Sequence, residues 1–224
     1  VALDRADALA PLRAQFDLPP GVIYLDGNSL GVLPRATPVR LQQVVRDEWG
    51  RDLIRAWNSA GWIDGPQRVG ARIGRLIGAR PGEVIAADST SLNLYKVLAV
   101  ALAQVRARGD AGRGVIVSER DNFPTDLYIA ESLARQHGCT LRLVDDDTAL
   151  AAQLHGPAGA EVAVLLLTHV HYRSGRMHPM AELTEAAHAA GARGVWNLAH
   201  SAGAVPVDLN GCDADFAVGC GYKY

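Results

Sequence analysis

Residues Val162–Thr168 read VAVLLLT, a run with no alternation of polar and apolar positions. A strand that is apolar on both faces is typical of the centre of a parallel sheet covered by helices on both sides. Other short β-rich runs flank this segment, and longer stretches with helical periodicity separate them. We therefore predict an α/β fold with a mainly parallel sheet flanked by helices.

The same patterns indicate the remaining elements of the fold. Thr37 is a candidate N-cap for a helix that runs through about residue 49. A second helix is predicted over residues 66–79, and Gly78 is expected to end it. The other predicted helices cover residues 92–108, 125–137, 147–154 and 181–190. The other predicted strands cover residues 22–25, 114–118, 140–144, 194–198 and 216–219. We divide the chain into an N-terminal segment, residues 1–65, and a large domain, residues 66–224.

Length and charge restrict the class of protein. The 224 residues are 49% apolar, which is enough for one sizeable domain with a buried core. A net charge of −2 gives no basic surface for nucleic acid or anionic membrane. No apolar run approaches the roughly 20 residues of a membrane span, and residues 1–5 lack the apolar core of a signal peptide. We expect a cytoplasmic protein with no membrane or nucleic-acid partner.

Cysteine and histidine spacing does not predict a metal site. Three cysteines make no even disulfide set and match no zinc pattern, so reduced core thiols are expected. His169 and His171 stand two apart on one face, but spacing ties no third ligand to them. The acidic run 145–147 is interpreted as the cap of the following helix, and Arg173 and Arg176 as part of a solvated loop.

Reactive side chains follow most of the predicted strands. In open α/β sheets, ligands bind at the carboxyl ends of the strands. The segments found there are 89–91, 122–126, 168–172, 197–200 and 222–223. Of the 22 basic residues only Lys96 and Lys223 are lysines. Because arginine forms no Schiff base with an aldehyde, Lys223 is the candidate for that chemistry.

Four motifs resemble the kynureninase family in order and spacing. They are YLDGNSLG at 24–31, NFPTD at 122–126, NLAHSAG at 197–203 and GYKY at 221–224. Kynureninases are fold-type I enzymes that use pyridoxal phosphate (PLP) to hydrolyse L-kynurenine to anthranilate and L-alanine in tryptophan catabolism. The resemblance covers the whole chain but about half of such an enzyme, which implies that the small C-terminal domain is absent from this chain. It also implies a homodimer.

The resemblance implies a role for individual residues. Lys223 would hold PLP as a Schiff base and then move the substrate Cα proton, with Tyr222 assisting proton transfer and reaching the phosphate. The other residues implied in cofactor binding are Thr90, Ser91, Phe123, Thr125, Asp126, Thr168, Asn197 and His200. Among these, Thr90 and Ser91 would donate to the phosphate at a helix N-terminus, and Phe123 would stack on the pyridine ring. Asn28, Ser29 and Trp62 would lie toward the substrate, L-kynurenine or its 3-hydroxy form.

Asn197 departs from the family pattern, which has aspartate at this position. That carboxylate pairs with the protonated pyridine nitrogen, and a neutral amide does so poorly. Three interpretations remain open: a natural variant that relies on Asp126, an impaired or engineered protein, or a difference in the sequence record. Two other functions also remain open. One is a different class V aminotransferase-family enzyme, such as a cysteine desulfurase, and the other is an inactive PLP-fold binding protein.

Overall fold

Strand β5 (Val162–Thr168) lies in the middle of a five-stranded sheet, and all of its residues are buried. The strand order is β4-β3-β5-β6-β7, and each neighbouring pair is parallel. The other strands are β3 (Val115–Glu119), β4 (Thr140–Val144), β6 (Arg193–Asn197) and β7 (Phe216–Val218). The predicted α/β class is confirmed, and the bounds of β5 agree with the prediction to the residue.

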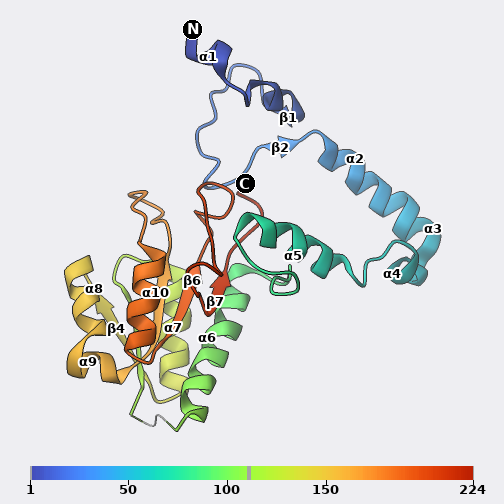
Figure 1. Cartoon of the computed structure of the whole chain (residues 1–224). Helices are drawn as coiled ribbons and strands as arrows, with labels where there is room; N and C mark the ends of the chain where they lie inside the picture. The colour runs from blue at the N-terminus through green and yellow to red at the C-terminus, as the bar shows by residue number, and fades with distance from the viewer. Residues whose placement is uncertain (1, 110–111, 224) are drawn as a thin grey trace. The chain divides into compact units, whose positions relative to one another are not determined.

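Helices cover both faces of this sheet (Figure 1). They are α6 (Thr90–Ala107), α7 (Pro124–Gln136), α8 (Asp147–Leu154) and α10 (Met180–Ala189). Leu165 and Leu167 pack in one apolar core with side chains of α8 and α10, while Val164 and Leu166 pack in a second core with α6 and α7. Because successive residues of a strand face opposite sides, β5 must be apolar throughout to serve both cores.

The chain is described here from a computed structural model, which covers residues 2–109 and 112–223. These residues form two compact units, one of Gly70–Gly221 and the other of residues up to Val69 together with 222–223. The functional division predicted after residue 65 stays a prediction. Val1, at the start of the chain, and Tyr224, the last residue of the GYKY motif, lie outside the described residues.

The smaller unit consists of short elements. They are α1 (Ala2–Ala6), η1 (Ala10–Gln15), β1 (Phe16–Asp17), β2 (Leu33–Pro34), α2 (Ala36–Gln43), the π-helical turn η2 (Val44–Trp49), α3 (Gly50–Asp52), η3 (Leu53–Arg55) and α4 (Ala56–Ser59). β1 and β2 pair antiparallel. The predicted strand at residues 22–25 is wrong. Ile23 and Leu25 are exposed, and in the described part of this unit the only strands are β1 and β2, which pair with each other. The Thr37 cap is also wrong, since α2 begins at Ala36.

Two further helices complete the described chain. Helix α5 (Gly65–Leu76) ends shortly before Gly78, whose φ of 65° is the left-handed conformation that commonly follows a helix, as predicted. Helix α9 (Gly156–Glu161) was not predicted. None of the helices formed by residues 2–109 and 112–223 has the length and apolar character needed to cross a membrane.

Candidate active site

Polar side chains at the carboxyl ends of β3 and β5 form a chain of hydrogen bonds. Thr168 Oγ1 donates to Asn122 Oδ1 at 2.6 Å, and Asn122 Nδ2 donates to Ser118 Oγ at 3.0 Å. The Ser118 hydroxyl in turn donates to the carbonyl oxygen of Leu166 at 2.8 Å. The structure therefore brings together two of the predicted segments, 122–126 and 168–172. The role of Thr168 toward a cofactor stays a prediction.

Asp126 and Asn197 form a second buried contact at the same end of the sheet. Asp126 lies in the first turn of α7, where a helix N-terminus favours an acidic side chain, and Asn197 is the last residue of β6. Asn197 Nδ2 donates to Asp126 Oδ2 at 2.6 Å, while Asn197 Oδ1 accepts from the backbone N–H of Ala199 at 2.9 Å. The amide is thus held from both sides, with its donor directed at the carboxyl group.

The environment of Asp126 disfavours its charged form. Its side chain is only 2% exposed. Burial raises the pKa of Asp126 above its ordinary value, and the hydrogen bond from Asn197 offsets only part of this effect. The site therefore holds a buried carboxyl group one hydrogen bond away from the position where the resemblance predicts an aspartate. Thr125, on the same turn of α7, and His200, in the turn after β6, are both half-buried.

Phe123 is a surface aromatic residue at the start of α7. It precedes Pro124, the first residue of the helix, and 40% of it is exposed. Its ring meets that of Tyr172 edge to face, with centroids 5.4 Å apart and planes at 80°. Because the two rings are not stacked on each other, the contact restrains Phe123 without covering it with a parallel ring. Stacking on a planar ligand requires an aromatic ring that is accessible in part, as Phe123 is.

The N-terminus of α6 is capped by Ser89, which the sequence did not single out as the cap. Ser89 Oγ accepts a hydrogen bond from the backbone N–H of Leu92 at 3.3 Å, so the helix begins at Thr90 rather than after Ser91. Thr90 Oγ1 donates to the carbonyl oxygen of Gly219 at 2.9 Å, which ties the helix start to the segment after β7. Ser91 is half-buried. The predicted phosphate contacts of Thr90 and Ser91 stay predictions.

In the smaller unit, the predicted lysine motif meets the first of the four motifs. The backbone N–H of Gly31 donates to the carbonyl oxygen of Tyr222 at 2.7 Å. A Cβ atom on Gly31 would lie 2.9 Å from the carbonyl oxygen of Lys223, so any side chain there would collide with backbone. Two motifs almost two hundred residues apart in sequence are therefore in direct contact.

The two lysines have different surroundings. Lys223 is buried, and its Nζ lies 5.8 Å from the centroid of the Tyr222 ring, which is itself 58% exposed. Lys96 forms an ion pair with Asp88 between exposed side chains. A lysine amine is the side chain that can form a Schiff base with an aldehyde. Burial therefore distinguishes Lys223 as the candidate that the sequence selected.

The predicted substrate residues occupy two different places in the smaller unit. Asn28 and Ser29 are exposed in the turn that follows residue 26, and Tyr24 Oη braces this turn by donating to the carbonyl oxygen of Leu30 at 2.8 Å. Trp62 is half-buried, and its Nε1 donates to Glu48 Oε2 at 2.7 Å. Their roles toward a substrate stay predictions.

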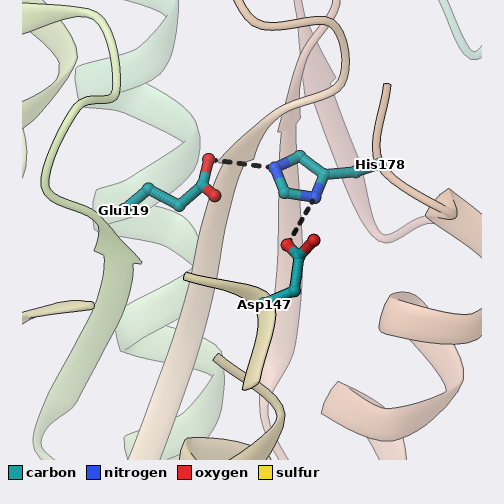
Figure 2. Close-up of side chains that lie close together, drawn as sticks. All are labelled: Glu119, Asp147 and His178. Carbon is teal, nitrogen blue, oxygen red and sulfur yellow. Dashed lines mark hydrogen bonds and ion pairs between the residues drawn. The ribbon is translucent and has the colours of Figure 1, made fainter. Parts of the chain in front are cut away.

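A buried ionic cluster, which sequence reasoning missed, lies beside the end of β3. Glu119 and His178 are almost fully buried, and His178 Nε2 lies 2.9 Å from Glu119 Oε2 (Figure 2). His178 Nδ1 faces Asp147 Oδ1 at 3.8 Å. Arg176 forms ion pairs with both Glu119 and Asp147, the latter at 2.9 Å. Burial by itself raises the pKa of Glu119, but the hydrogen bonds and charges of His178 and Arg176 outweigh it and hold the pKa below its ordinary value.

The donor atoms of Glu119, Asp147 and His178 lie within 4.8 Å of one another, close enough to share a metal ion. The guanidinium of Arg176, however, already provides the positive charge between the two carboxylates. The cluster is therefore an ion-pair network. The expectation that Arg176 lies in a solvated loop is wrong, because its charge pairs with a buried glutamate far away in the sequence. Asp146 caps α8 by accepting from Ala149 N–H at 2.7 Å, as expected for the acidic run.

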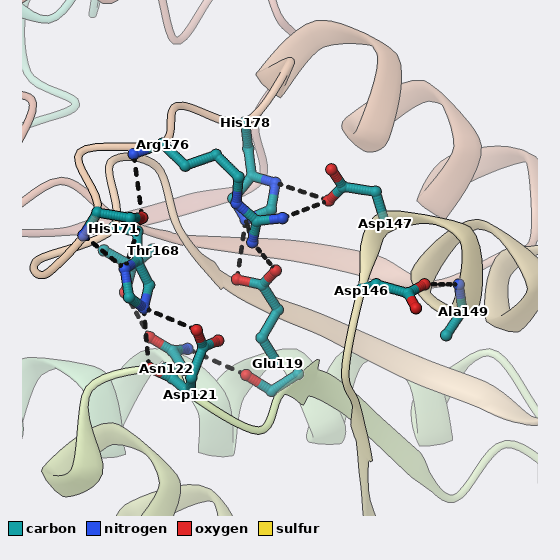
Figure 3. A network of polar contacts seen from close by, with 12 residues as sticks. Glu119, Asp121, Asn122, Asp146, Asp147, Ala149, Thr168, His171, Arg176 and His178 are labelled. Atoms are coloured by element: carbon teal, nitrogen blue, oxygen red, sulfur yellow. Dashed lines mark hydrogen bonds and ion pairs between the residues drawn. The ribbon is translucent and has the colours of Figure 1, made fainter.

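His171 braces the loop that follows β5 (Figure 3). Its Nδ1 accepts from the backbone N–H of Ser174 at 3.2 Å, which leaves the proton on Nε2 to be donated to the carbonyl oxygen of Asp121 at 3.0 Å. His169 instead packs edge-on against Trp196, with ring centroids 6.1 Å apart. His171 therefore holds the loop by hydrogen bonds, whereas His169 packs against an aromatic ring.

Solved structures with a similar architecture identify the fold of this chain. It matches a cysteine desulfurase from Thermococcus onnurineus NA1 with a TM-score of 0.72 and 22% identity, over 95% of this chain and 52% of that one. It matches a cysteine desulfurase from Escherichia coli with a TM-score of 0.71 and 21% identity, over 97% and 55%. The predicted fold-type I architecture is thereby confirmed.

Sequence comparison gives the family. Residues 51–224 match the aminotransferase class-V family, and the chain belongs to it. The chain is 57% identical to the kynureninase of Pseudomonas fluorescens and 57% identical to that of Burkholderia pseudomallei, in each case over 100% of this chain and 53% of the relative. It thus spans about half the length of the curated relatives that it matches.

Proposed function

We propose that this chain is the PLP-binding part of an enzyme that hydrolyses L-kynurenine, or its 3-hydroxy form, to an anthranilate and L-alanine. The observation that carries the proposal is the 57% identity to kynureninases over the whole chain. The similarity to cysteine desulfurases is 21–22% and supports the shared fold alone. The alternatives raised by the sequence are therefore not favoured.

The residues that the resemblance selects fit PLP in their chemistry. The cofactor offers an aldehyde, a flat ring with a basic nitrogen, and a phosphate. The chain offers a buried lysine, an exposed aromatic ring at Phe123, a buried carboxyl group at Asp126, and hydroxyls at a helix N-terminus. When bound, PLP supplies an electron sink that makes the substrate Cα proton acidic.

The roles of the chain's own residues follow from their environments. Lys223, which is buried, would release the cofactor aldehyde to the substrate amine and then carry the proton from the substrate Cα. Tyr222, beside it, would assist this proton transfer. Phe123 would orient the cofactor ring, and Asp126 with Asn197 would hold the charge around the ring nitrogen. Water would be kept from this carboxyl pair by its burial.

The test uses the full-length protein with its natural C-terminal half. Anthranilate fluorescence is followed after addition of L-kynurenine, and borohydride reduction followed by peptide mass spectrometry locates the lysine that carries the cofactor. We expect anthranilate release and a label on Lys223, with Lys96→Arg active and Lys223→Arg inactive. A protein that binds PLP but releases no anthranilate, or a label on Lys96, would contradict the proposal.

We further propose a homodimer in the cytoplasm. The unpaired thiols of Cys139, Cys212 and Cys220 support a reducing compartment. Large apolar side chains are exposed in the smaller unit, among them Trp49, Ile54 and Trp57, which supports burial against a second copy. Sedimentation of the full-length protein at micromolar concentration tests the assembly, and a monomer would contradict it.

A further inference from the structure

Polar contacts join the end of β3 and the segment that follows it to the hairpin after β5. The hairpin comprises residues 168–178 and is closed by an isolated bridge between Val170 and Met177. Three polar contacts link the two segments: Thr168 to Asn122, His171 to Asp121, and the Arg176 and His178 pair to Glu119 (Figure 3). A surface loop with so many fixed contacts is expected to be rigid.

Tyr172 is the aromatic contact of this hairpin. Its ring meets Phe123 edge to face at 5.4 Å. It is itself held by its neighbours, since the Arg173 guanidinium lies 5.2 Å from its centroid and the His171 ring lies 5.1 Å away. Two of the polar links described above involve Asn122 and His171, the residues that directly precede Phe123 and Tyr172.

The ring of Phe123 is partly exposed, and its described aromatic contact is with Tyr172. Phe123 is 40% exposed and precedes the helix rather than lying within it. Its backbone is well fixed, because Phe123 N–H donates to Asn122 Oδ1 at 2.7 Å and its carbonyl oxygen accepts from Asp126 N–H at 2.9 Å. The orientation of an exposed ring on a fixed backbone depends on its side-chain neighbours.

We infer that Tyr172 is a positioning residue, which fixes the plane of the Phe123 ring so that its face is ready to receive the cofactor ring. The inference rests on the proposed function, which assigns that stacking to Phe123. The edge-to-face geometry suits this role, because it orients one ring while leaving it free of a parallel partner. Orientation in advance of binding strengthens binding by removing a loss of side-chain freedom.

The first arm of the test needs no cofactor. The chain has three phenylalanines, Phe16, Phe123 and Phe216, so the full-length apo-protein labelled with 4-fluorophenylalanine has one ¹⁹F resonance for each of them, besides those of the C-terminal half. Phe123→Leu identifies the resonance of Phe123. We expect Tyr172→Leu to move or broaden that resonance and leave those of Phe16 and Phe216 in place. Tyr128→Leu, a change at a 68% exposed tyrosine of α7, is the matched control and should move none.

The second arm measures PLP itself. We expect Tyr172→Leu to weaken PLP binding roughly 2- to 10-fold, as for loss of an aromatic pair, and to change the visible circular dichroism of the bound cofactor. Tyr172→Phe keeps the ring and should restore both values, and Tyr128→Leu should change neither. The thermal midpoint of each apo-variant shows whether a loss comes from unfolding.

The outcomes separate the inference from the proposed function. If the wild-type protein binds no PLP, the proposed function fails, while the ¹⁹F result still reports on the contact. If the wild type binds PLP and Tyr172→Leu binds it equally well with an unchanged dichroism spectrum, the inference is overturned. An unmoved Phe123 resonance in Tyr172→Leu would overturn it as well.

Discussion

The carboxamide of Asn197 donates a hydrogen bond across 2.6 Å to the carboxyl group of Asp126, at a place where both side chains are buried. The other end of the amide is occupied by the backbone N–H of Ala199. Both ends of the amide are therefore hydrogen-bonded, which fixes its orientation. A change of charge at Asn197 or Asp126 acts directly on the side chain of the other residue.

Replacing Asn197 by aspartate puts two carboxyl groups in contact, and we expect them to share one proton. Like charges raise the pKa of such a pair above the unfolded value of about 3.9. The contribution of the shared proton to the unfolding free energy is then fully present at acid pH, and it is lost as the pH rises through the raised pKa. We expect Asn197→Asp to lose about 1–3 kcal/mol of unfolding free energy at pH 8, and much less near pH 4, in urea titrations.

Asn210→Asp is the matched control for this change. Asn210 Nδ2 also donates to a carboxylate, Glu83 Oε2 at 2.9 Å, but Asn210 is half-buried and Glu83 is exposed, so solvent screens the charges. An equal loss of stability in Asn210→Asp would show that burial at Asn197 is not the cause.

Asp126→Asn should change the pH dependence in the opposite way. The folded-state pKa of Asp126 is raised, so its favourable contribution is present below the unfolded pKa and declines as the pH rises through the folded value. Removing the titrating group removes that decline. We expect the unfolding free energy of the variant, relative to wild type, to increase between pH 4 and pH 8, and a constant difference would contradict the assignment.

Glu119→Gln should destabilise the protein strongly and in a pH-dependent manner. It leaves Arg176 and His178 without their buried carboxylate partner, and breaking such a pair typically costs about 3–5 kcal/mol. Because the pKa of Glu119 is depressed, its contribution is present above the unfolded pKa and lost as the pH falls through the folded value. The difference in unfolding free energy should therefore shrink in acid.

Glu161→Gln serves as the control for Glu119→Gln. Glu161 forms its ion pair with Arg142 between side chains that are more exposed, and such pairs contribute about 0–1 kcal/mol. Similar losses for the two variants would mean that the buried network adds no more than a surface pair.

Gly31→Ala tests the contact between the two distant motifs. Its Cβ would stand 2.9 Å from the carbonyl oxygen of Lys223 and 3.1 Å from that of Tyr222, so the backbone that carries the lysine must shift. Gly27→Ala meets no atom within 4 Å. In the full-length protein we expect Gly31→Ala to slow anthranilate release at least tenfold, because a displacement near 1 Å can cost about 100-fold. Gly27→Ala should stay within about twofold, and equal rates for the two would refute the role of the contact.

The sequence predicted the sheet well and the long-range polar contacts poorly. Val162–Thr168 was recognised because a strand that is buried on both faces has apolar residues at nearly every position. Residues 22–25 carry the same kind of apolar residues, yet form no strand, because pairing depends on a partner that local sequence does not contain. The pairing of Arg176 with Glu119 spans 57 residues, and only the fold brings them together.

The candidate site was found in part for the same reason. Strand ends gather polar residues at one edge, so Asn122, Thr168 and Asn197 could be grouped in advance. One of the three interpretations of Asn197 relied on Asp126 as a substitute carboxylate, and the hydrogen bond between the two residues gives that interpretation a geometric basis. Ser89 was missed as the cap because Thr90 and Ser91 are equally good capping residues, and their order along the helix start decides between them.

The hydrogen bond from Gly31 to Tyr222 also bears on the order of folding. A contact between residues 191 positions apart closes a very long loop, and such contacts form late because their entropy cost must be met by structure already in place. During synthesis, residue 31 emerges from the ribosome long before its partner. We therefore expect the surroundings of Lys223 to be among the last parts of the chain to become native, after the sheet has assembled.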